Sequence, residues 1–107
     1  MSALASPRVF ELLRAAIQQR TPVRLLYGGH CREVCPHVLG YKDRRAHVLV
    51  FQFAGGSSHP LPAGGEWKCL AVSGIRDIEL REGLWHSAPN YGPGQSCVGD
   101  VVAAIDS

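Results

Sequence analysis

The chain contains a single segment with helical periodicity, and every apolar run after it has the length of a β-strand. Val9, Leu13 and Ile17 recur every four residues, which places them on one face of a helix over about residues 7–20. Pro22 ends this helix, because proline disfavours the α conformation in the residue before it. A lone amphipathic helix must bury its apolar face against other elements, so the fold depends on the strands that follow.

Short apolar runs separated by turn residues predict those strands. Gly28-Gly29 is a two-residue hairpin signal, and Asp43-Arg44-Arg45 marks the next turn. Residues 54–65 are rich in glycine, proline and serine, which predicts a long loop. The last apolar stretch, residues 98–105, contains valines that favour a strand and paired alanines that favour a short helix, and we expect the strand. The other expected strands span residues 23–27, 31–39, 46–53, 67–72 and 75–80.

One N-terminal helix and about five short antiparallel strands predict a mainly β (α+β) domain in which the strands close into a small barrel. An open sheet packed on the helix is the competing architecture. We expect one domain over residues 1–107, with the barrel over residues 23–82 and a loop and C-terminal segment over residues 83–107.

Charge and cysteine content limit the class of protein. A net charge of +2 and a pI near 8.5 are too weak to indicate a nucleic-acid-binding protein by themselves. No apolar run has the length of a membrane span, and the N-terminus lacks the pattern of a signal peptide, so we expect a cytoplasmic protein. We therefore expect the four cysteines to be reduced and mostly buried.

The order of these elements, and several residues within them, resemble the WYL domain family over residues 9–85. The shared features are an Ala-Ile helix segment, a strand that ends in tyrosine, an Arg-x-Val-x-Pro strand and a later strand closed by isoleucine. At the Trp-Tyr-Leu strand that names the family, only a leucine is kept, within residues 46–49. The other matching segments are Ala15-Ala16-Ile17, Val23 to Tyr27, Arg32-Glu-Val-Cys-Pro36 followed by Leu39-Gly40, and Trp67 to Ile75.

The resemblance implies an SH3-like or Sm-like barrel that senses nucleic acids or nucleotide-like ligands through a basic, aromatic-lined face. Such domains are usually fused to a helix-turn-helix domain, and we expect this chain to be a stand-alone WYL-like domain without one. Ala71 and Gly74 stand where the family carries arginines, so part of the basic face is missing.

We expect a ligand site around the glycine hairpin and the long loop. Tyr27 and Arg32 flank Gly28-Gly29, and a guanidinium beside an aromatic ring suits a phosphate and a base. The structural alternative is a tyrosine in the barrel wall with the arginine paired to a surface carboxylate such as Glu33. The glycine-rich loop can surround an anion with its N–H groups, or it is simply a mobile surface loop. The predicted ligand-binding residues are Tyr27, Arg32, Gln52, Ser57, Trp67 and Lys68.

A second group of cations lies in the expected turn between two strands. Lys42, Arg44 and Arg45 suit contact with a nucleic-acid backbone. A solvated hairpin tip that includes Asp43 is the structural alternative.

Metal binding and catalysis have weak sequence support. His30, Cys31, Cys35 and His37 are near one another, but strand side chains four residues apart stand about 13 Å apart, too far to chelate one metal. No local motif pairs a cysteine with a histidine, and no close carboxylate pair suggests acid–base catalysis. We expect no metal, no cofactor and no enzyme activity.

Two functions remain open. The first is a ligand-sensing or regulatory module that binds nucleotides or single-stranded nucleic acid in transcription regulation, together with a partner regulator protein. The second is a protein–protein interaction or dimerisation domain that has lost its ligand site and uses the barrel edge and residues 97–105. A homodimer fits either function, and no membrane contact is expected.

Overall fold

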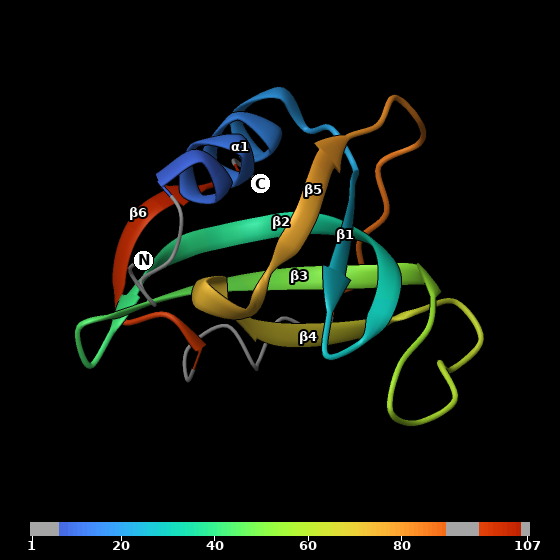
Figure 1. Ribbon diagram of the computed structural model, residues 1–107. Coiled ribbons are helices and arrows are strands. Elements are labelled where there is room, and N and C mark those ends of the chain that lie inside the picture. The colour runs from blue at the N-terminus through green and yellow to red at the C-terminus, as the bar shows by residue number, and fades with distance from the viewer. Residues whose placement is uncertain (1–6, 90–96, 106–107) are drawn as a thin grey trace.

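The computed structural model describes residues 7–89 and 97–105 and confirms a mainly β fold with one helix. The strands are β1 (Val23–Tyr27), β2 (His30–Lys42), β3 (Arg45–Gly55), β4 (Glu66–Ala71), β5 (Arg76–Leu80) and β6 (Asp100–Ala104). The α-helix α1 (Pro7–Gln19) packs against β2, β5 and β6 (Figure 1). One turn of 3-10 helix, η1 (Val72–Gly74), joins β4 to β5.

The strands form a six-stranded antiparallel sheet in the order β4-β3-β2-β1-β5, with β6 paired to β2 beyond the end of β1. No ladder joins β4 to β5 within residues 7–89 and 97–105, so this sheet is not closed, and the predicted barrel is not confirmed. In the view of Figure 1, β1 and β5 cross the long strands β2 and β3, which curve strongly. The sixth strand, β6, lies within residues 98–105, so the prediction of a strand rather than a short helix there is confirmed.

Most element bounds follow the sequence prediction, and the helix and β1 match it within one residue. Strands β2 and β3 are longer than expected and run up to the Asp43-Arg44 turn. Backbone pairing continues through polar residues there, because ladder hydrogen bonds do not require apolar side chains. Ser6, whose hydroxyl is the N-cap that we expect for this helix from the Ser6-Pro7 pair, lies outside the described residues.

The main core lies between α1 and one face of the sheet. Leu13 and Ile17 of the helix are almost fully buried against it, as their four-residue spacing predicts. The strand residues in this cluster are Val23, Leu25, Val34, Leu39, Val48, Val50 and Leu70, together with Val72 and Ile75.

A second, smaller core covers the opposite face of the long strands. Val38 and Leu49 pack there against Val98, which follows Cys97 in the C-terminal segment. Residues 34–40 of β2 are therefore buried on both faces, which explains why this part of the sequence does not alternate between apolar and polar residues.

A disulfide between Cys69 and Cys97 fastens the C-terminal segment to β4, so the prediction of reduced thiols is wrong for this pair. The two Cα atoms are 5.6 Å apart, within the normal range for a disulfide. Closing a loop of this length stabilises the fold by roughly 3–4 kcal/mol in the chain-entropy model. Of the two free cysteines, Cys35 is buried as expected but Cys31 is exposed.

β2 contains a β-bulge at Pro36-His37. Pro36 pairs with Val50 and Val38 pairs with Leu49, so His37 is the extra residue. A bulge allows a proline within an inner strand, because proline has no N–H to donate to a ladder. The bulge also directs the His37 side chain out of the regular alternation.

We predict that Arg44→Gly raises the free energy of unfolding by about 0.5–1 kcal/mol, since Arg44 has a left-handed φ of 66° that glycine adopts without strain. The adjacent change Arg45→Gly, in β3, should lower that free energy by about 0.5–1 kcal/mol. Urea denaturation followed by tryptophan fluorescence measures both. A less stable Arg44→Gly protein would contradict the turn conformation.

Candidate functional site

Arg32 is buried beside the glycine hairpin, with only 5% of its surface exposed. Its Nε donates to the carbonyl oxygen of Tyr27 at 3.1 Å, and its Nη1 donates to Oε1 of Gln52 at 3.2 Å. The guanidinium carbon lies 5.4 Å from the centroid of the Tyr27 ring. The structure thus brings Tyr27 and Arg32 together, as their positions on either side of Gly28-Gly29 predict.

Gln52 connects this arginine to the glycine-rich loop. The side chain is fully buried, and its Nε2 donates to the carbonyl oxygens of Ala54 at 3.1 Å and Gly56 at 2.9 Å. Both acceptors are carbonyls, so the amide orientation follows from the contacts. Gln52 therefore holds the start of the loop in place with one end and orients Arg32 with the other.

Lys68 and Ser57 lie next in this arrangement. The Lys68 Nζ donates to Ser57 Oγ at 3.1 Å and is 3.3 Å from Oε1 of Glu66. Its side chain is 20% exposed, so it reaches solvent more than Arg32 does. Gln52 contacts both Arg32 and the Gly56 carbonyl, and the neighbouring Ser57 contacts Lys68. The two cationic side chains therefore lie at the same end of the sheet.

The Arg32 guanidinium has no carboxylate within ion-pair distance among residues 7–89 and 97–105, so the expected alternative of a pair with Glu33 is wrong. Burying an ion without a counter-ion is costly. Here a carbonyl oxygen, an amide oxygen and an aromatic ring offset part of that cost, and the charge of Arg32 itself has no carboxylate partner among the described residues.

Tyr27 is a wall residue rather than an open stacking platform. Its hydroxyl accepts a hydrogen bond from the Ala71 N–H at 3.1 Å. A Cβ placed on Gly74 would come within 2.9 Å of the ring, so the backbone of η1 lies directly against it. The ring is packed by Arg32 and Gly74, and this matches the structural alternative for Tyr27.

Trp67 does not belong to this group, which corrects the prediction. Its ring lies 5.2 Å from that of Phe51 and 4.7 Å from that of His37, on the opposite face of the sheet from Lys68. Successive side chains on a strand point to opposite faces, so Trp67 and Lys68 cannot line the same site.

The basic turn lies at the other end of the β2–β3 hairpin. Lys42 pairs with Arg45 next to the turn, whereas Arg32 pairs with Gly55 at the opposite end of the two strands. Arg44 and Arg45 are exposed. The structure therefore separates the predicted backbone-binding residues from the predicted ligand-binding residues.

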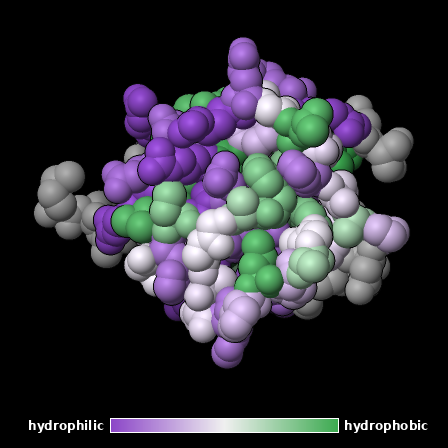
Figure 2. Space-filling model, turned by 90° about the vertical axis from the view of Figure 1, so that its right-hand side faces the viewer, coloured by the Kyte–Doolittle hydropathy of each residue, from purple (hydrophilic) through white to green (hydrophobic). Residues whose placement is uncertain are grey.

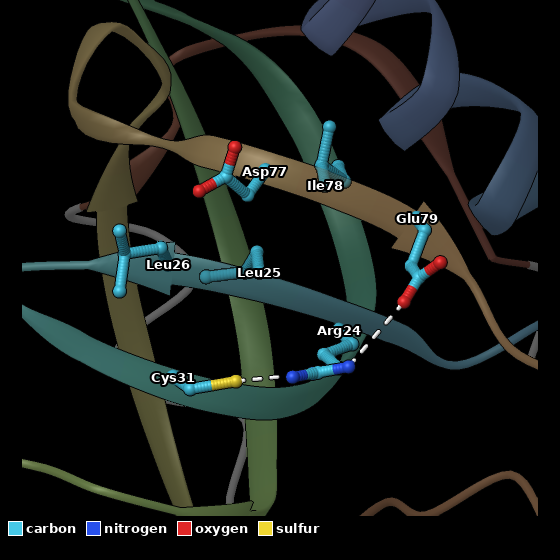
Figure 3. A pocket seen from close by; sticks show the side chains of 7 residues that line it. All are labelled: Arg24, Leu25, Leu26, Cys31, Asp77, Ile78 and Glu79. Atoms are coloured by element: carbon cyan, nitrogen blue, oxygen red, sulfur yellow. Dashed lines mark hydrogen bonds and ion pairs between the residues drawn. The ribbon is translucent and has the colours of Figure 1, made fainter.

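An open pocket of about 480 Å³ lies between β1, the start of β2 and β5, where the sequence indicated nothing (Figure 3). Arg24 Nε donates to Cys31 Sγ at 3.1 Å, and Arg24 Nη1 lies 3.6 Å from Glu79 Oε1. These contacts, with that to Cys31 the largest, raise the pKa of Arg24. Asp77 adds a second carboxylate to the lining, so the pocket carries charges of both signs.

The bulge places His37 in a buried polar cluster that the sequence analysis missed. Its Nδ1 lies 2.7 Å from the carbonyl oxygen of Cys35, and its Nε2 lies 3.0 Å from Ser87 Oγ. The ring is 4.9 Å from that of Trp85. Burial, more than the nearby charge of Arg20, lowers the pKa of His37. The available signal was a Pro-His pair inside an apolar strand, which is typical of a bulge.

The segment after β5 covers this face of the sheet. The His86 N–H donates to Cys35 Sγ at 3.2 Å, and burial raises the pKa of that thiol to about 11. The rings of His86 and Phe53 stack with their centroids 4.0 Å apart. On the right-hand side of Figure 1, where this segment and the β3–β4 loop lie, hydrophilic and hydrophobic residues are interspersed (Figure 2).

Within the described part of the chain, no three histidine, cysteine or acidic side chains gather closely enough to hold a metal ion. The one helix described there is too short and too polar to cross a bilayer. Comparison with protein-family models, with curated proteins and with solved structures gave no match for this chain. The resemblance to the WYL family therefore remains an expectation from the sequence.

We predict that Arg32→Ala lowers the free energy of unfolding by roughly 2–4 kcal/mol, because it leaves the buried Gln52 oxygen without a donor. The matched change Arg24→Ala, at an exposed arginine, should lower the free energy of unfolding much less than Arg32→Ala does. Urea denaturation of both variants makes the comparison. Equal losses would show that the buried network contributes nothing beyond a surface contact.

We predict that stability falls as the pH drops below 6.5, the ordinary pKa of histidine, because the unfolded chain then binds a proton that buried His37 resists. One such group changes the free energy of unfolding by at most about 1.4 kcal/mol per pH unit. The loss of stability stops once the pH is below the lowered pKa of His37 in the folded state. His37→Gln should remove this component, whereas His59→Gln, at an exposed histidine, should leave it unchanged. Denaturation at a series of pH values measures the slope, and an identical profile in His37→Gln would contradict it.

Proposed function

We propose that this chain is a regulatory binding module for phosphate-bearing ligands, such as nucleotides or short single-stranded nucleic acid, and not an enzyme. The observation that carries this proposal is the pair of cations at one end of the sheet, where Arg32 is buried without a carboxylate partner among the described residues. A phosphate supplies the negative charge that Arg32 lacks, and it competes with Glu66 for Lys68. The resemblance to WYL domains supports a role in transcription regulation with a partner regulator protein.

The roles of the residues differ in this proposal. Lys68 and Ser57 supply the donors that reach solvent, whereas Arg32 and Gln52 act as positioning residues beneath them. Gly55 has a φ of 95°, and a Cβ there would come within 2.5 Å of the Cys31 carbonyl, so only glycine fits where the loop begins. The Gly56 N–H donates to the Cys31 carbonyl oxygen at 2.9 Å, so an anion meets only the N–H groups from Ser57 onward. Because Tyr27 is packed on both Arg32 and Gly74, recognition rests on the phosphate rather than on base stacking.

We also propose that the sheet is a small SH3-like or Sm-like barrel of the WYL type. Its two edge strands, β4 and β5, are connected only by η1 and Ile75, which keeps the end of one beside the start of the other. A cytoplasmic location remains part of the proposal, although the Cys69–Cys97 disulfide is more typical of an oxidising compartment.

The alternative function, a protein–protein interaction or homodimerisation domain, is favoured by β6. Its only strand partner among the described residues is β2, and Val101 and Val102 are 58% and 43% exposed. An apolar strand with a free edge is a common site of pairing with another chain.

The test is fluorescence anisotropy of labelled oligothymidylate and oligouridylate, titrated with the protein at low and at physiological salt. We expect micromolar or tighter binding at low salt that weakens as salt is added. Lys68→Gln should weaken binding several-fold and reduce the slope of log affinity against log salt by about one.

Arg45→Gln, at the far end of the β2–β3 hairpin, is the matched control and should leave binding unchanged. Loss of binding in Arg45→Gln alone would move the site to the basic turn. No binding at either salt would overturn the proposal, and light scattering would then show whether the protein is a dimer, as the alternative requires.

A further inference from the structure

The tautomer of His37 follows from its contacts. A carbonyl oxygen only accepts hydrogen bonds, so the Nδ1 atom, 2.7 Å from the Cys35 carbonyl, carries the ring proton. The Nε2 atom then carries a lone pair rather than a proton, so the hydroxyl of Ser87, 3.0 Å away, is the donor in this contact. The Ser87 proton therefore points directly at a base.

The surroundings keep that base neutral and fixed. His37 is fully buried, and the rings of Trp67 and Trp85 lie 4.7 and 4.9 Å from it. Burial lowers its pKa, so the imidazole is neutral at neutral pH and able to accept a proton. This is the arrangement of a serine nucleophile, with a backbone carbonyl as the group that orients the histidine.

Ser87 itself is exposed, so a reagent in solution can reach its oxygen. The cluster also holds a donor without an acceptor, because the Trp85 Nε1 is buried and has no hydrogen-bond partner in the described part of the chain. A buried N–H of this kind gains an acceptor when an oxyanion forms nearby.

We propose that Ser87 is a nucleophile, activated by His37, that accepts an acyl group from small activated esters. Ser87 Oγ attacks the ester carbonyl carbon and forms a new C–O bond, while its proton moves to Nε2 of His37. The bond from that carbon to the leaving oxygen breaks, and the oxygen departs with the electron pair. The imidazolium then gives its proton to the departing oxygen, which leaves acyl-serine and the free alcohol. This inference concerns the acylation step alone and is independent of the phosphate-binding proposal.

The probe is p-nitrophenyl acetate, incubated with the 107-residue chain at neutral pH and followed by peptide mapping with mass spectrometry. Fragment spectra separate serine adducts from those on lysine or cysteine. Ser73, an exposed serine in η1, is the internal control within the same chain. We expect Ser87 to be acetylated at least tenfold faster than Ser73, consistent with the usual contribution of general-base catalysis of about a hundredfold or more.

Variants test each part of the arrangement. Ser87→Ala should remove the adduct, and His37→Gln should lower the rate at Ser87 to that at Ser73, with circular dichroism confirming the fold. Trp85→Phe, which keeps the ring and removes its N–H, should lower the rate at Ser87 several-fold. If His37→Gln does not fold, the comparison of Ser87 with Ser73 in the unmodified chain decides. Equal rates at the two serines, or an unchanged rate at Ser87 in a folded His37→Gln protein, would overturn the proposal.

Discussion

Burial of β2 on both faces is the constraint on which the rest of this structure depends. Over residues 34–40 one face meets the core under α1, and the other meets the segment that leads into β6. A strand buried in this way needs all of its backbone groups paired, and β1, β3 and β6 share that role along its length. Gly40 shows how close the packing is, since a Cβ there would come within 2.0 Å of the Asp100 carbonyl oxygen.

The same constraint explains why the polar chemistry lies where it does. Covering the second face with the segment after β5 places Ser87 and His86 over a strand that contains His37 and Cys35. A buried imidazole needs partners for both of its nitrogens, and the bulge at Pro36-His37 places the ring between a backbone carbonyl and a serine. The covering segment and the bulge are thus two parts of one arrangement.

At the end of the sheet near the glycine hairpin, the buried charge of Arg32 likewise determines where the neighbouring polar groups lie. Arg32 cannot be buried cheaply, so its donors are matched to the Tyr27 carbonyl and to Gln52. Gln52 in turn fixes the first residues of the glycine-rich loop, and Lys68 reaches the same loop through Ser57. The shape of the proposed ligand site therefore follows from the need to satisfy one interior arginine.

The sequence by itself determined the elements whose signals are local. The four-residue spacing of Val9, Leu13 and Ile17 defines the helix and its buried face, and the Gly28-Gly29 and Asp43-Arg44 turns define the hairpins. It also indicated that Tyr27 and Arg32 meet, because the two-residue turn pairs Tyr27 with His30 and places Arg32 two residues further along the same face.

Only the tertiary structure decided which distant residues share a face. Gln52 meets Arg32 across 20 residues, Ser87 meets His37 across 50, and Cys97 returns to Cys69 across 28. These contacts depend on strand register and on bulges, where a shift of one residue moves a side chain to the other face of a sheet. For that reason Trp67, adjacent in sequence to Lys68, lies away from the proposed ligand site, while Ser87, which no motif singled out, lies against a buried histidine.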